Sequence, residues 1–226
     1  MMVATAVRDL PWPAADTIHL HWLSGLAGRS RAPLRALLGR YLGVAPDQVV
    51  MAQTGPAGKP FLPAGGGLCF NWSHSRDLAL VAVACGTELG VDVEFSDRRV
   101  SARELATRYF AAEEAEFLSS LPEEHARRVF LRLWTGKEAV LKAVGCGISE
   151  GLDRVRLHLD ADGELRLRAL EFEAAVSESM HLQALPVPQP NLLAALAWTG
   201  HARELVHHTG SRPLAESALR DCNAIG

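Results

Sequence analysis

Two acidic side chains, two residues apart, are the first residues whose types and spacing suggest chemistry. Residues 90–95 alternate between apolar and polar, which predicts a β-strand. On such a strand Asp92 and Glu94 share one face and lie roughly 6–7 Å apart. Neighbouring carboxylates repel each other, and a divalent cation between them relieves that repulsion. The segment therefore suggests a metal site, and a solvent-facing strand edge explains it equally well.

A second pair of ionisable residues lies within residues 130–147. Apolar residues recur there at the spacing of one helical face, and Gly145 is a natural C-terminal stop, so we predict an amphipathic helix. Glu138 and Lys142 are one turn apart and lie beside the apolar stripe rather than opposite it. Such a helix can form one wall of a polar site. The alternative, which this segment alone favours, is an amphipathic helix with an ion pair at its edge.

Lys137 has a less ordinary position, because it projects from the middle of the apolar stripe. A lone buried ammonium is costly, so Lys137 requires an anionic partner, a ligand or a break in the helix at Gly136. Upstream, residues 120–123 read Ser-Leu-Pro-Glu and predict a capping box at the start of the helix.

The composition is that of an ordinary globular chain. Its 226 residues are 48% hydrophobic and 22% charged, with a formal net charge of −3. This balance gives no reason to expect nucleic acid or an anionic membrane as a partner. No apolar run reaches membrane-spanning length and the start lacks the pattern of a signal peptide, so we expect a cytoplasmic protein. The four cysteines indicate neither a zinc site nor a disulfide framework.

Alternation, helical spacing and turn residues predict the remaining elements. Expected strands cover residues 18–23, 48–52, 68–72, 78–84, 155–159, 164–170, 180–185 and 192–198, with residues 3–7 as an optional edge strand. Expected helices cover residues 33–42, 101–109 and 112–118, and residues 73–77 read as a polar turn. His19 and His21 suggest a metal site only weakly, because a half-exposed strand face explains them better. Residues after Gly200 read as a tail with at most one helix, whose histidines receive no function.

The order of elements repeats in outline. A helix, a glycine stop, two strands and an apolar strand occupy residues 33–84, and the same order returns in residues 130–198. Two similar halves with a site at their seam explain the repeat. We therefore predict an α+β (α/β) fold with a pseudo-twofold duplication and three parts: an N-terminal half of residues 1–98, a C-terminal half of residues 99–200 and a tail of residues 201–226. Three carboxylates, those of Asp92, Glu94 and Glu138, would converge at the seam.

Three motifs in this order resemble those of the 4′-phosphopantetheinyl transferases. They are Asn-Trp-Ser-His-Ser at residues 71–75, Gly-Val-Asp-Val-Glu at residues 90–94 and Trp-Thr-Gly-Lys-Glu-Ala-Val-Leu-Lys at residues 134–142. The chain is most similar to the monomeric surfactin-synthetase-activating (Sfp-like) branch. Each motif alone is loose, whereas all three in order are highly specific. The similarity spans most of the chain, from Arg31 to Trp198.

The resemblance implies a monomer of two similar α/β halves, with coenzyme A and a magnesium ion in the cleft between them. Asp92, Glu94 and Glu138 match the acidic metal ligands of the family. Lys142 matches the lysine that contacts the diphosphate of coenzyme A.

The resemblance also assigns residues to the rest of coenzyme A and to proton transfer. Ser73 and His74 match residues that touch its phosphates, and two basic residues match contacts at the nucleotide end, Arg35 and Lys59. Glu114 aligns with a glutamate proposed as general base, although the adjacent Glu113 leaves the register open. The family usually carries a longer basic segment before the helix of residues 33–42. Here either Arg29 or Arg31 substitutes for it, or the affinity for the nucleotide is reduced.

The implied reaction moves 4′-phosphopantetheine from coenzyme A to a serine of an apo acyl or peptidyl carrier protein and releases 3′,5′-ADP. Such carriers serve fatty acid, polyketide or nonribosomal peptide biosynthesis. A hard cation offsets charge on the leaving group, and Lys142 and His74 add hydrogen-bond donors there. The serine nucleophile belongs to the carrier and loses its proton to a carboxylate or a metal-linked water. Two alternatives stay open, namely another Mg²⁺-dependent diphosphate-cleaving enzyme and a non-catalytic module that binds carrier protein or coenzyme A.

Overall fold

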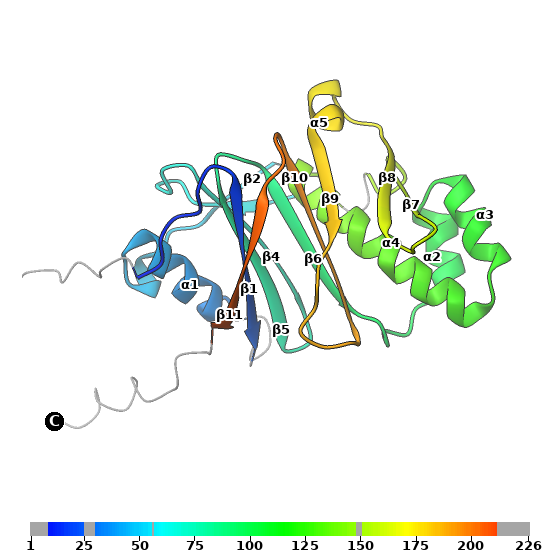
Figure 1. Ribbon diagram of the computed structural model, residues 1–226, viewed down its shortest axis with the longest axis horizontal. Coiled ribbons are helices and arrows are strands. Elements are labelled where there is room, and N and C mark those ends of the chain that lie inside the picture. The colour runs from blue at the N-terminus through cyan, green and yellow to red at the C-terminus, as the bar shows by residue number, and fades with distance from the viewer. Residues whose placement is uncertain (1–8, 25–29, 56, 148–150, 212–226) are drawn as a thin grey trace, which may run out of the picture.

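The computed structural model describes residues 9–24, 30–55, 57–147 and 151–211, and its first sheet has four strands (Figure 1). These strands are β1 (Thr17–Ser24), β4 (Leu68–Ser75), β5 (Leu78–Cys85) and β11 (Glu204–Ser211). They lie in the order β11-β1-β5-β4. Strand β1 pairs antiparallel with β5 and parallel with β11, and β5 pairs antiparallel with β4. The first sheet therefore combines strands from the early and late parts of the described chain.

The second sheet has three antiparallel strands in the order β6-β10-β9. Its strands are β6 (Leu89–Phe95), β9 (Met180–Ala184) and β10 (Leu192–Thr199). Two small antiparallel hairpins accompany the sheets, formed by β2 (Ala52–Thr54) with β3 (Lys59–Phe61) and by β7 (Val155–Leu159) with β8 (Leu165–Leu170).

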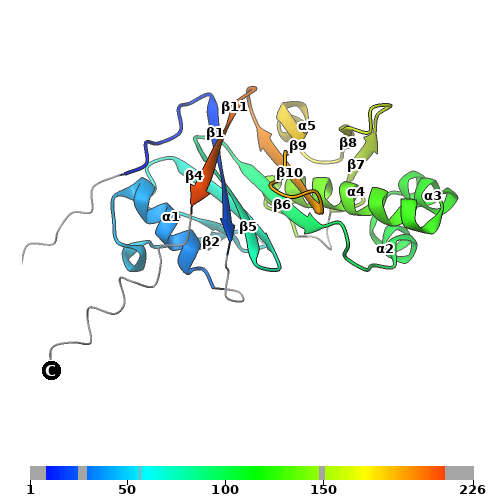
Figure 2. The same cartoon turned by 60° about the horizontal axis from the view of Figure 1, so that its bottom comes forward.

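The described helices include one on the outer face of each sheet. They are α1 (Ala32–Leu42), the 3₁₀ turn η1 (Pro46–Gln48), α2 (Ala102–Tyr109), α3 (Ala112–Ser120), α4 (Glu123–Val144) and α5 (Ala174–Ser179). In both ribbon views α1 lies beside the first sheet, and the long α4 runs along the second sheet towards α2 and α3 (Figures 1 and 2). No described helix has the length and apolar character needed to cross a bilayer.

Three apolar cores hold these layers together. One lies between α1 and the first sheet, and includes Leu38 and Val81. A second lies between the two sheets, where the apolar faces of β1 and β5 meet those of β6 and β10. The third joins α4 to the second sheet, to α2 and α3, and to the β7–β8 hairpin. The sheets are thus packed face to face, with a helix on each outer side.

The predicted α+β class and most predicted elements are confirmed. The helix of residues 33–42 ends at Gly43 and the central helix ends at Gly145, and both glycines are left-handed. Helix α4 runs unbroken through Gly136, where a Cβ atom would meet Leu157 and Leu165 of the hairpin. The break in the helix that was one explanation for Lys137 is therefore excluded.

Four predictions about secondary structure are wrong. The proposed capping box fails because Ser120 ends α3, where its hydroxyl donates to the carbonyl oxygen of Phe117, and α4 begins after Pro122. The strand expected at residues 48–52 begins only at Ala52. Strand β4 continues to Ser75, so the turn is shorter than predicted.

The fourth error concerns residues 204–211, which we predicted to belong to a tail with at most one helix. They form β11, because the backbone of β1 pairs with this half-polar segment. Strand formation there depends on that distant pairing rather than on the local sequence pattern. The optional edge strand at residues 3–7 lies outside the described residues.

The predicted duplication has a counterpart in topology, since β1-β5-β4 and β6-β10-β9 share the same order and antiparallel sense. Common descent of the two halves stays a prediction, as do the boundaries proposed for them. The pairing of β6 with β10 favours a boundary before Leu89 over one after residue 98.

Gly90 allows β6 to lie directly against α4, and this yields a stability prediction. A Cβ atom at this position would meet backbone atoms of Ala139, Lys142 and Ala143. We expect Gly90→Ala to lower the free energy of unfolding by about 3 kcal/mol or more, since helix backbone cannot move aside. Urea denaturation measures the loss. Gly147→Ala is the matched control, because its Cβ meets open space; equal stability of the two variants would contradict the close approach.

Candidate active site

The candidate site lies where β4 of the first sheet runs beside β6 of the second. Side chains, rather than a backbone ladder between the described strands, join them. The amide oxygen of Asn71 accepts a hydrogen bond from the backbone N–H of Val91 at 3.0 Å. Further along, the Ser73 hydroxyl donates to Asp92 Oδ1 at 2.8 Å, and Ser75 donates to Glu94 at 3.2 Å. Three alternate residues of β4 thus meet Val91, Asp92 and Glu94 of β6, because alternate side chains of a strand share one face.

Helix α4 adds the cation of the site. Lys142 Nζ lies 2.7 Å from Asp92 Oδ1, 3.1 Å from the Ser73 hydroxyl and 3.2 Å from the carbonyl oxygen of Val91. Asp92 is buried and Lys142 is partly buried, with 28% of its side chain exposed. The three sequence motifs therefore meet at one point, through Ser73, Asp92 and Lys142.

Glu94 lies at the more open side of the cluster. Its carboxylate pairs with Arg98 and accepts the hydrogen bond from Ser75. Burial, followed by the negative charge of Asp92, raises the pKa of Glu94, while Arg98 opposes that rise. Arg98 and Ser75 were not singled out from the sequence as site residues. Their only sequence signal was the four-residue spacing from Glu94 and the alternation within the first motif.

Glu138 is the most strongly perturbed carboxyl of the cluster. It is 6% exposed and projects from α4. Burial, followed by the charge of Asp92, raises its pKa to about 7, while Lys142 opposes the shift and Glu94 adds to it. A divalent cation would favour the ionised form of Glu138 and so relieve this destabilisation.

The donor set fits a magnesium ion. Asp92 Oδ2 is buried and has no hydrogen-bond partner, although a buried carboxylate oxygen is normally satisfied. The groups around it are carboxylates, which magnesium prefers. The carboxylate oxygens of Asp92, Glu94 and Glu138 do not all lie within 4.8 Å of one another. The ammonium group of Lys142, which pairs with Asp92, supplies part of the positive charge that balances these three carboxylates.

Glu114, the residue aligned with a general base, lies apart from this cluster. It is 5% exposed and forms an ion pair with Lys137, which is fully buried, at 2.7 Å. Its carboxylate also accepts hydrogen bonds from the backbone N–H groups of Ala111 and Leu157. The anionic partner that we required for Lys137 is therefore Glu114.

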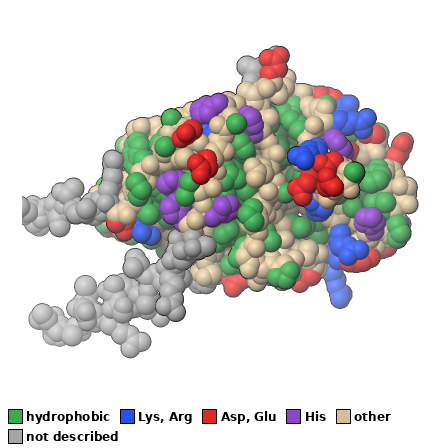
Figure 3. All heavy atoms as spheres, viewed as in Figure 1, with side chains coloured by type: hydrophobic (Ala, Val, Ile, Leu, Met, Phe, Trp, Pro, Cys, Tyr) green, Lys and Arg blue, Asp and Glu red, His purple; other side chains and the backbone are tan. Residues whose placement is uncertain are grey.

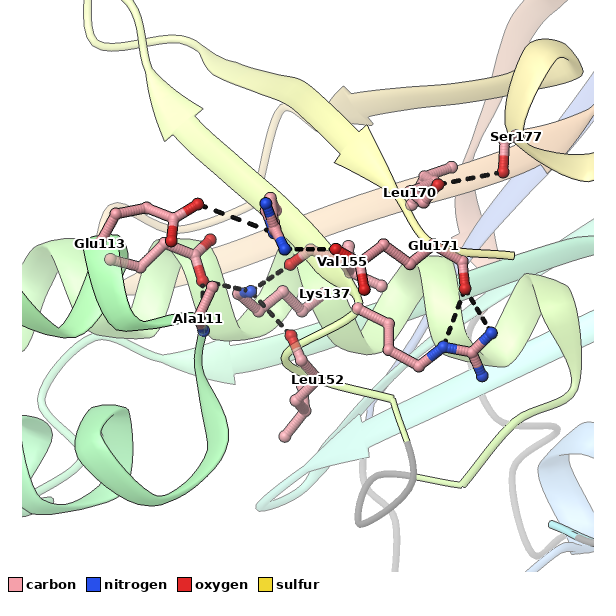
Figure 4. Close-up of polar contacts among 11 residues, drawn as sticks. Ala111, Glu113, Lys137, Leu152, Val155, Leu170, Glu171 and Ser177 are labelled. Atoms are coloured by element: carbon pink, nitrogen blue, oxygen red, sulfur yellow. Dashed lines mark hydrogen bonds and ion pairs between the residues drawn. The ribbon is translucent and has the colours of Figure 1, made fainter. Parts of the chain in front are cut away.

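The remaining protons of Lys137 also have acceptors. Lys137 Nζ donates to the carbonyl oxygens of Leu152 and Val155 (Figure 4). Glu113, the other residue that could align with the family's general base, pairs instead with Arg156 at 3.7 Å and is half exposed. Neither Glu113 nor Glu114 contacts the acidic cluster through these interactions.

The residues assigned to coenzyme A separate into two groups. Ser73 faces β6, whereas His74 follows it in β4 and stacks on Trp72, whose ring packs on the α1 side of the sheet. Lys59 lies at the seam, where it pairs with Glu88 and donates to the carbonyl oxygen of Ala143 at 3.0 Å.

Arg35 has no contact with that seam among its described hydrogen bonds. Its guanidinium donates to the carbonyl oxygen of Val49, which follows η1. Arg31 is exposed just before α1, and Arg29 lies outside the described residues. The fold therefore brings Ser73 and Lys142 together with the predicted metal ligands and places Lys59 near them at the seam. It leaves His74 and Arg35 away from that cluster.

Carboxylates and a lysine gathered between two sheets are groups that can bind a hard cation and phosphate oxygens. Comparison with known proteins identifies the family. A model of the 4′-phosphopantetheinyl transferase superfamily matches residues 88–199. The chain is also 38% identical over 180 residues to the 4′-phosphopantetheinyl transferase HetI of Nostoc sp., covering 75% of this chain and 69% of that protein. The chain belongs to the 4′-phosphopantetheinyl transferase superfamily.

For two other relatives, the alignment with this chain covers a smaller share of the relative's own length. The putative 4′-phosphopantetheinyl transferase slr0495 of Synechocystis sp. is 40% identical over 55% of this chain and 51% of that protein. The 4′-phosphopantetheinyl transferase psf-1 of Bacillus pumilus is 35% identical over 57% of this chain and 54% of that protein. The chain thus spans about half the length of these two. A solved holo-(acyl-carrier-protein) synthase from Bacillus anthracis, in complex with CoA (3′,5′-ADP), has a TM-score of 0.39 at 19% identity, over 50% of this chain and 94% of that one.

The raised pKa of Glu138 predicts a pH-dependent stability without metal. The folded protein holds this proton up to about pH 7, whereas the unfolded chain releases it near the ordinary value of 4.5. The contribution of Glu138 to the free energy of unfolding is therefore fully present below pH 4.5 and is lost as the pH rises to about 7. In EDTA, Glu138→Gln should become more stable than the native chain by on the order of 2 kcal/mol towards pH 8.

Urea denaturation across this pH range measures the difference. Glu123→Gln is the matched control, because Glu123 is an exposed carboxylate in the first turn of the same helix. A difference between Glu138→Gln and the native chain that stays constant with pH would contradict the raised pKa.

The buried ion pair predicts an asymmetric response to mutation. Lys137→Met should cost about 3–5 kcal/mol of stability, because it leaves the Glu114 carboxylate buried without its ammonium partner. Adding Glu114→Gln should recover part of that loss. The control is Arg128→Met in the same helix, an exposed position expected within about 0.5 kcal/mol of the native chain. Equal costs for the single and double variants, measured in urea, would show that Lys137 and Glu114 are not coupled.

Proposed function

We propose that this protein transfers 4′-phosphopantetheine from coenzyme A to a serine hydroxyl of an apo acyl or peptidyl carrier protein. The hydroxyl oxygen forms a bond to the phosphorus that carries pantetheine, the bond between the two phosphates breaks, and 3′,5′-ADP leaves. The convergence of Ser73, Asp92 and Lys142 carries the proposal, because it joins three separate motifs at one polar site. The names of the relatives support the same reaction.

Asp92, Glu94 and Glu138 would hold a magnesium ion in this proposal. The buried, unpartnered Asp92 Oδ2 and the raised pKa of Glu138 support the assignment. Magnesium, when bound, supplies positive charge for the diphosphate and for the charge that develops on the leaving group.

Lys142 would bind the diphosphate. Its three contacts, to Asp92, Ser73 and the carbonyl of Val91, match the three protons of an ammonium group. Binding a phosphate oxygen therefore requires Lys142 to exchange one of these partners. The Ser73 hydroxyl accepts a hydrogen bond from Lys142 and donates one to Asp92, so Ser73 positions these two side chains relative to each other.

Glu114 acts as a structural residue in this proposal rather than as the general base. Its carboxylate is buried and already accepts an ammonium group and two backbone N–H groups. A general base must lie within hydrogen-bond reach of the proton that it removes. The serine proton is then taken by a carboxylate of the acidic cluster or by a water bound there.

The nucleotide end of coenzyme A would meet more exposed groups. His74 is exposed and stacked on Trp72, so it can donate to a phosphate at the margin of the sheet. Lys59 lies closer to the acidic cluster, one residue from Lys142 through its contact with Ala143. Arg35 would contribute only if its bond to Val49 were exchanged.

We further propose that the protein acts as a cytoplasmic monomer. Each half contributes to the seam within one chain, since β4 supplies Ser73 while β6 and α4 supply Asp92 and Lys142. A second copy is therefore not needed to complete the acidic site.

Intact-protein mass spectrometry tests the reaction. An apo carrier protein incubated with this chain, coenzyme A and Mg²⁺ should gain the mass of one phosphopantetheine group. The gain should disappear in EDTA and fall at least 100-fold in rate with Glu138→Ala, which removes a metal ligand. Glu123→Ala, on the same helix, should retain the native rate.

Carriers from fatty acid, polyketide and nonribosomal peptide synthesis should all be included. No mass gain on any of them, with coenzyme A binding intact, would favour a non-catalytic binding module. Cleavage of coenzyme A by water without modification of the carrier would favour another diphosphate-cleaving enzyme.

A further inference from the structure

Three histidines lie together at the opposite side of the first sheet from the acidic site. His19 and His21 are two residues apart in β1, so their side chains leave the same face. His208 of β11 is the register partner of His21 in the parallel β1–β11 pair. Each ring offers one nitrogen such that the three atoms lie within 4.8 Å of one another. Strand pairing alone brings His208 to the first two, because it is distant from them in sequence.

Two ring nitrogens of this cluster are buried without a hydrogen-bond partner. They are Nδ1 of His21, a residue that is 1% exposed, and Nε2 of His208. Buried polar atoms in native proteins are nearly always satisfied, so two unsatisfied nitrogens in one cluster require an explanation. The rings of His21 and His208 are stacked, with centroids 4.4 Å apart, and His19 lies 4.6 Å from His208 by the same measure.

Tyr41 of α1 fixes the orientation of the two strand histidines. Its hydroxyl oxygen lies 2.8 Å from Nδ1 of His19 and 2.7 Å from Nε2 of His21, and the tyrosine is fully buried. The phenolic group can donate its O–H to one ring and accept an N–H from the other, or accept an N–H from both rings, which is the arrangement that a bound metal ion favours. Nε2 of His19 and Nδ1 of His21 are then left as lone-pair nitrogens. Metal-bound histidines are commonly oriented in this way, by a partner on the other ring nitrogen.

We propose that His19, His21 and His208 bind one transition-metal ion of the Zn²⁺ type. Neutral imidazoles suit zinc, copper and nickel rather than magnesium, and three histidines with an open fourth position form a known zinc donor set. Zn–N bonds of about 2.0–2.1 Å place ligand nitrogens about 3.4 Å apart in a tetrahedron. The rings therefore close by small side-chain rotations on binding. Such rotation tilts His21 and His208 out of their present stack.

The surroundings of the cluster keep its imidazoles in the neutral form that binds metal. Burial, followed by the charge of His208, lowers the pKa of His19 to about 4 and that of His21 to about 3, so both rings stay neutral. Arg40 is the nearby positive charge that acts on His21 and His208. Its guanidinium is paired with Asp9 at 2.8 Å, which offsets the repulsion of a bound ion.

The metal would act as a clamp between two strands. Strand β11 lies at the edge of the first sheet and pairs only with β1 among the described strands. A metal held by His208 and by two residues of β1 cross-links this edge strand to the sheet, and it stabilises the folded state by mass action. This site is separate from the acidic cluster and does not depend on the transferase reaction.

Metal titration of the tag-free, full chain tests the proposal. The protein is stripped with EDTA, exchanged into excess Mg²⁺ to saturate the carboxylates, and titrated with Zn²⁺ by calorimetry. We expect one equivalent to bind and the melting temperature to rise. His208→Ala should weaken this binding at least tenfold, and Tyr41→Phe should weaken it by about 10- to 100-fold, as expected for loss of an orienting partner. Co²⁺ absorption provides an independent readout of nitrogen coordination.

His207→Ala is the matched control, because His207 is the exposed neighbour of His208 in the same strand. Exposed histidines also gather over this part of the surface and can bind ions adventitiously (Figure 3). His207→Ala should keep the native affinity. His208→Gln serves as a second variant if His208→Ala does not fold by circular dichroism. Equal binding by the native chain and by either folded His208 variant, or no binding at micromolar Zn²⁺, would overturn the proposal.

Discussion

The direct contact between the backbone of β6 and that of α4 is the constraint on which the site depends. Gly90 leaves no side chain between them, so the strand lies against the helix turn that contains Ala139 and Ala143. This approach sets the short reach from Lys142 to Asp92. A wider spacing would replace that ion pair with water and would weaken every electrostatic interaction at the seam. A glycine without chemistry of its own therefore controls the chemistry of its neighbours.

Two adjacent residues of α4 serve opposite purposes. Lys137 is satisfied completely by Glu114 and two carbonyl oxygens, which fixes α3 and the β7 segment against the helix. Glu138 remains under electrostatic tension, with its pKa raised by burial and neighbouring acids. A helix turns by about 100° per residue, so a single α4 presents a rigid anchor on one side and a carboxyl group of raised pKa on the other. Rigid support of this kind is what a preorganised site requires.

Sequence patterns predicted those parts of the molecule in which local preference and tertiary structure agree. Alternation placed Asp92 and Glu94 on one face of β6, and helical spacing placed Glu138 beside Lys142. Sequence reasoning failed where long-range pairing decides. The β1–β11 ladder turns an apparent tail into a strand, and the anion that Lys137 requires is supplied by Glu114 of another helix. Pairing between distant segments leaves no local periodicity, so the sequence showed that Lys137 needs a partner but showed neither which residue it is nor that β11 is a strand.

The parallel pairing of β11 with β1 also has a consequence for synthesis on the ribosome. Strands β1, β4 and β5 can pair soon after they emerge, whereas β11 is translated after the whole second sheet. The edge of β1 that β11 later covers is therefore unpaired during most of translation, and exposed strand edges invite association with other chains. Two histidines occur on β1 itself, and alternating polar residues make an open edge less adhesive than a wholly apolar one. His19 and His21, which join His208 in the folded sheet, would then also protect the edge of β1 from association with other chains before β11 has been translated.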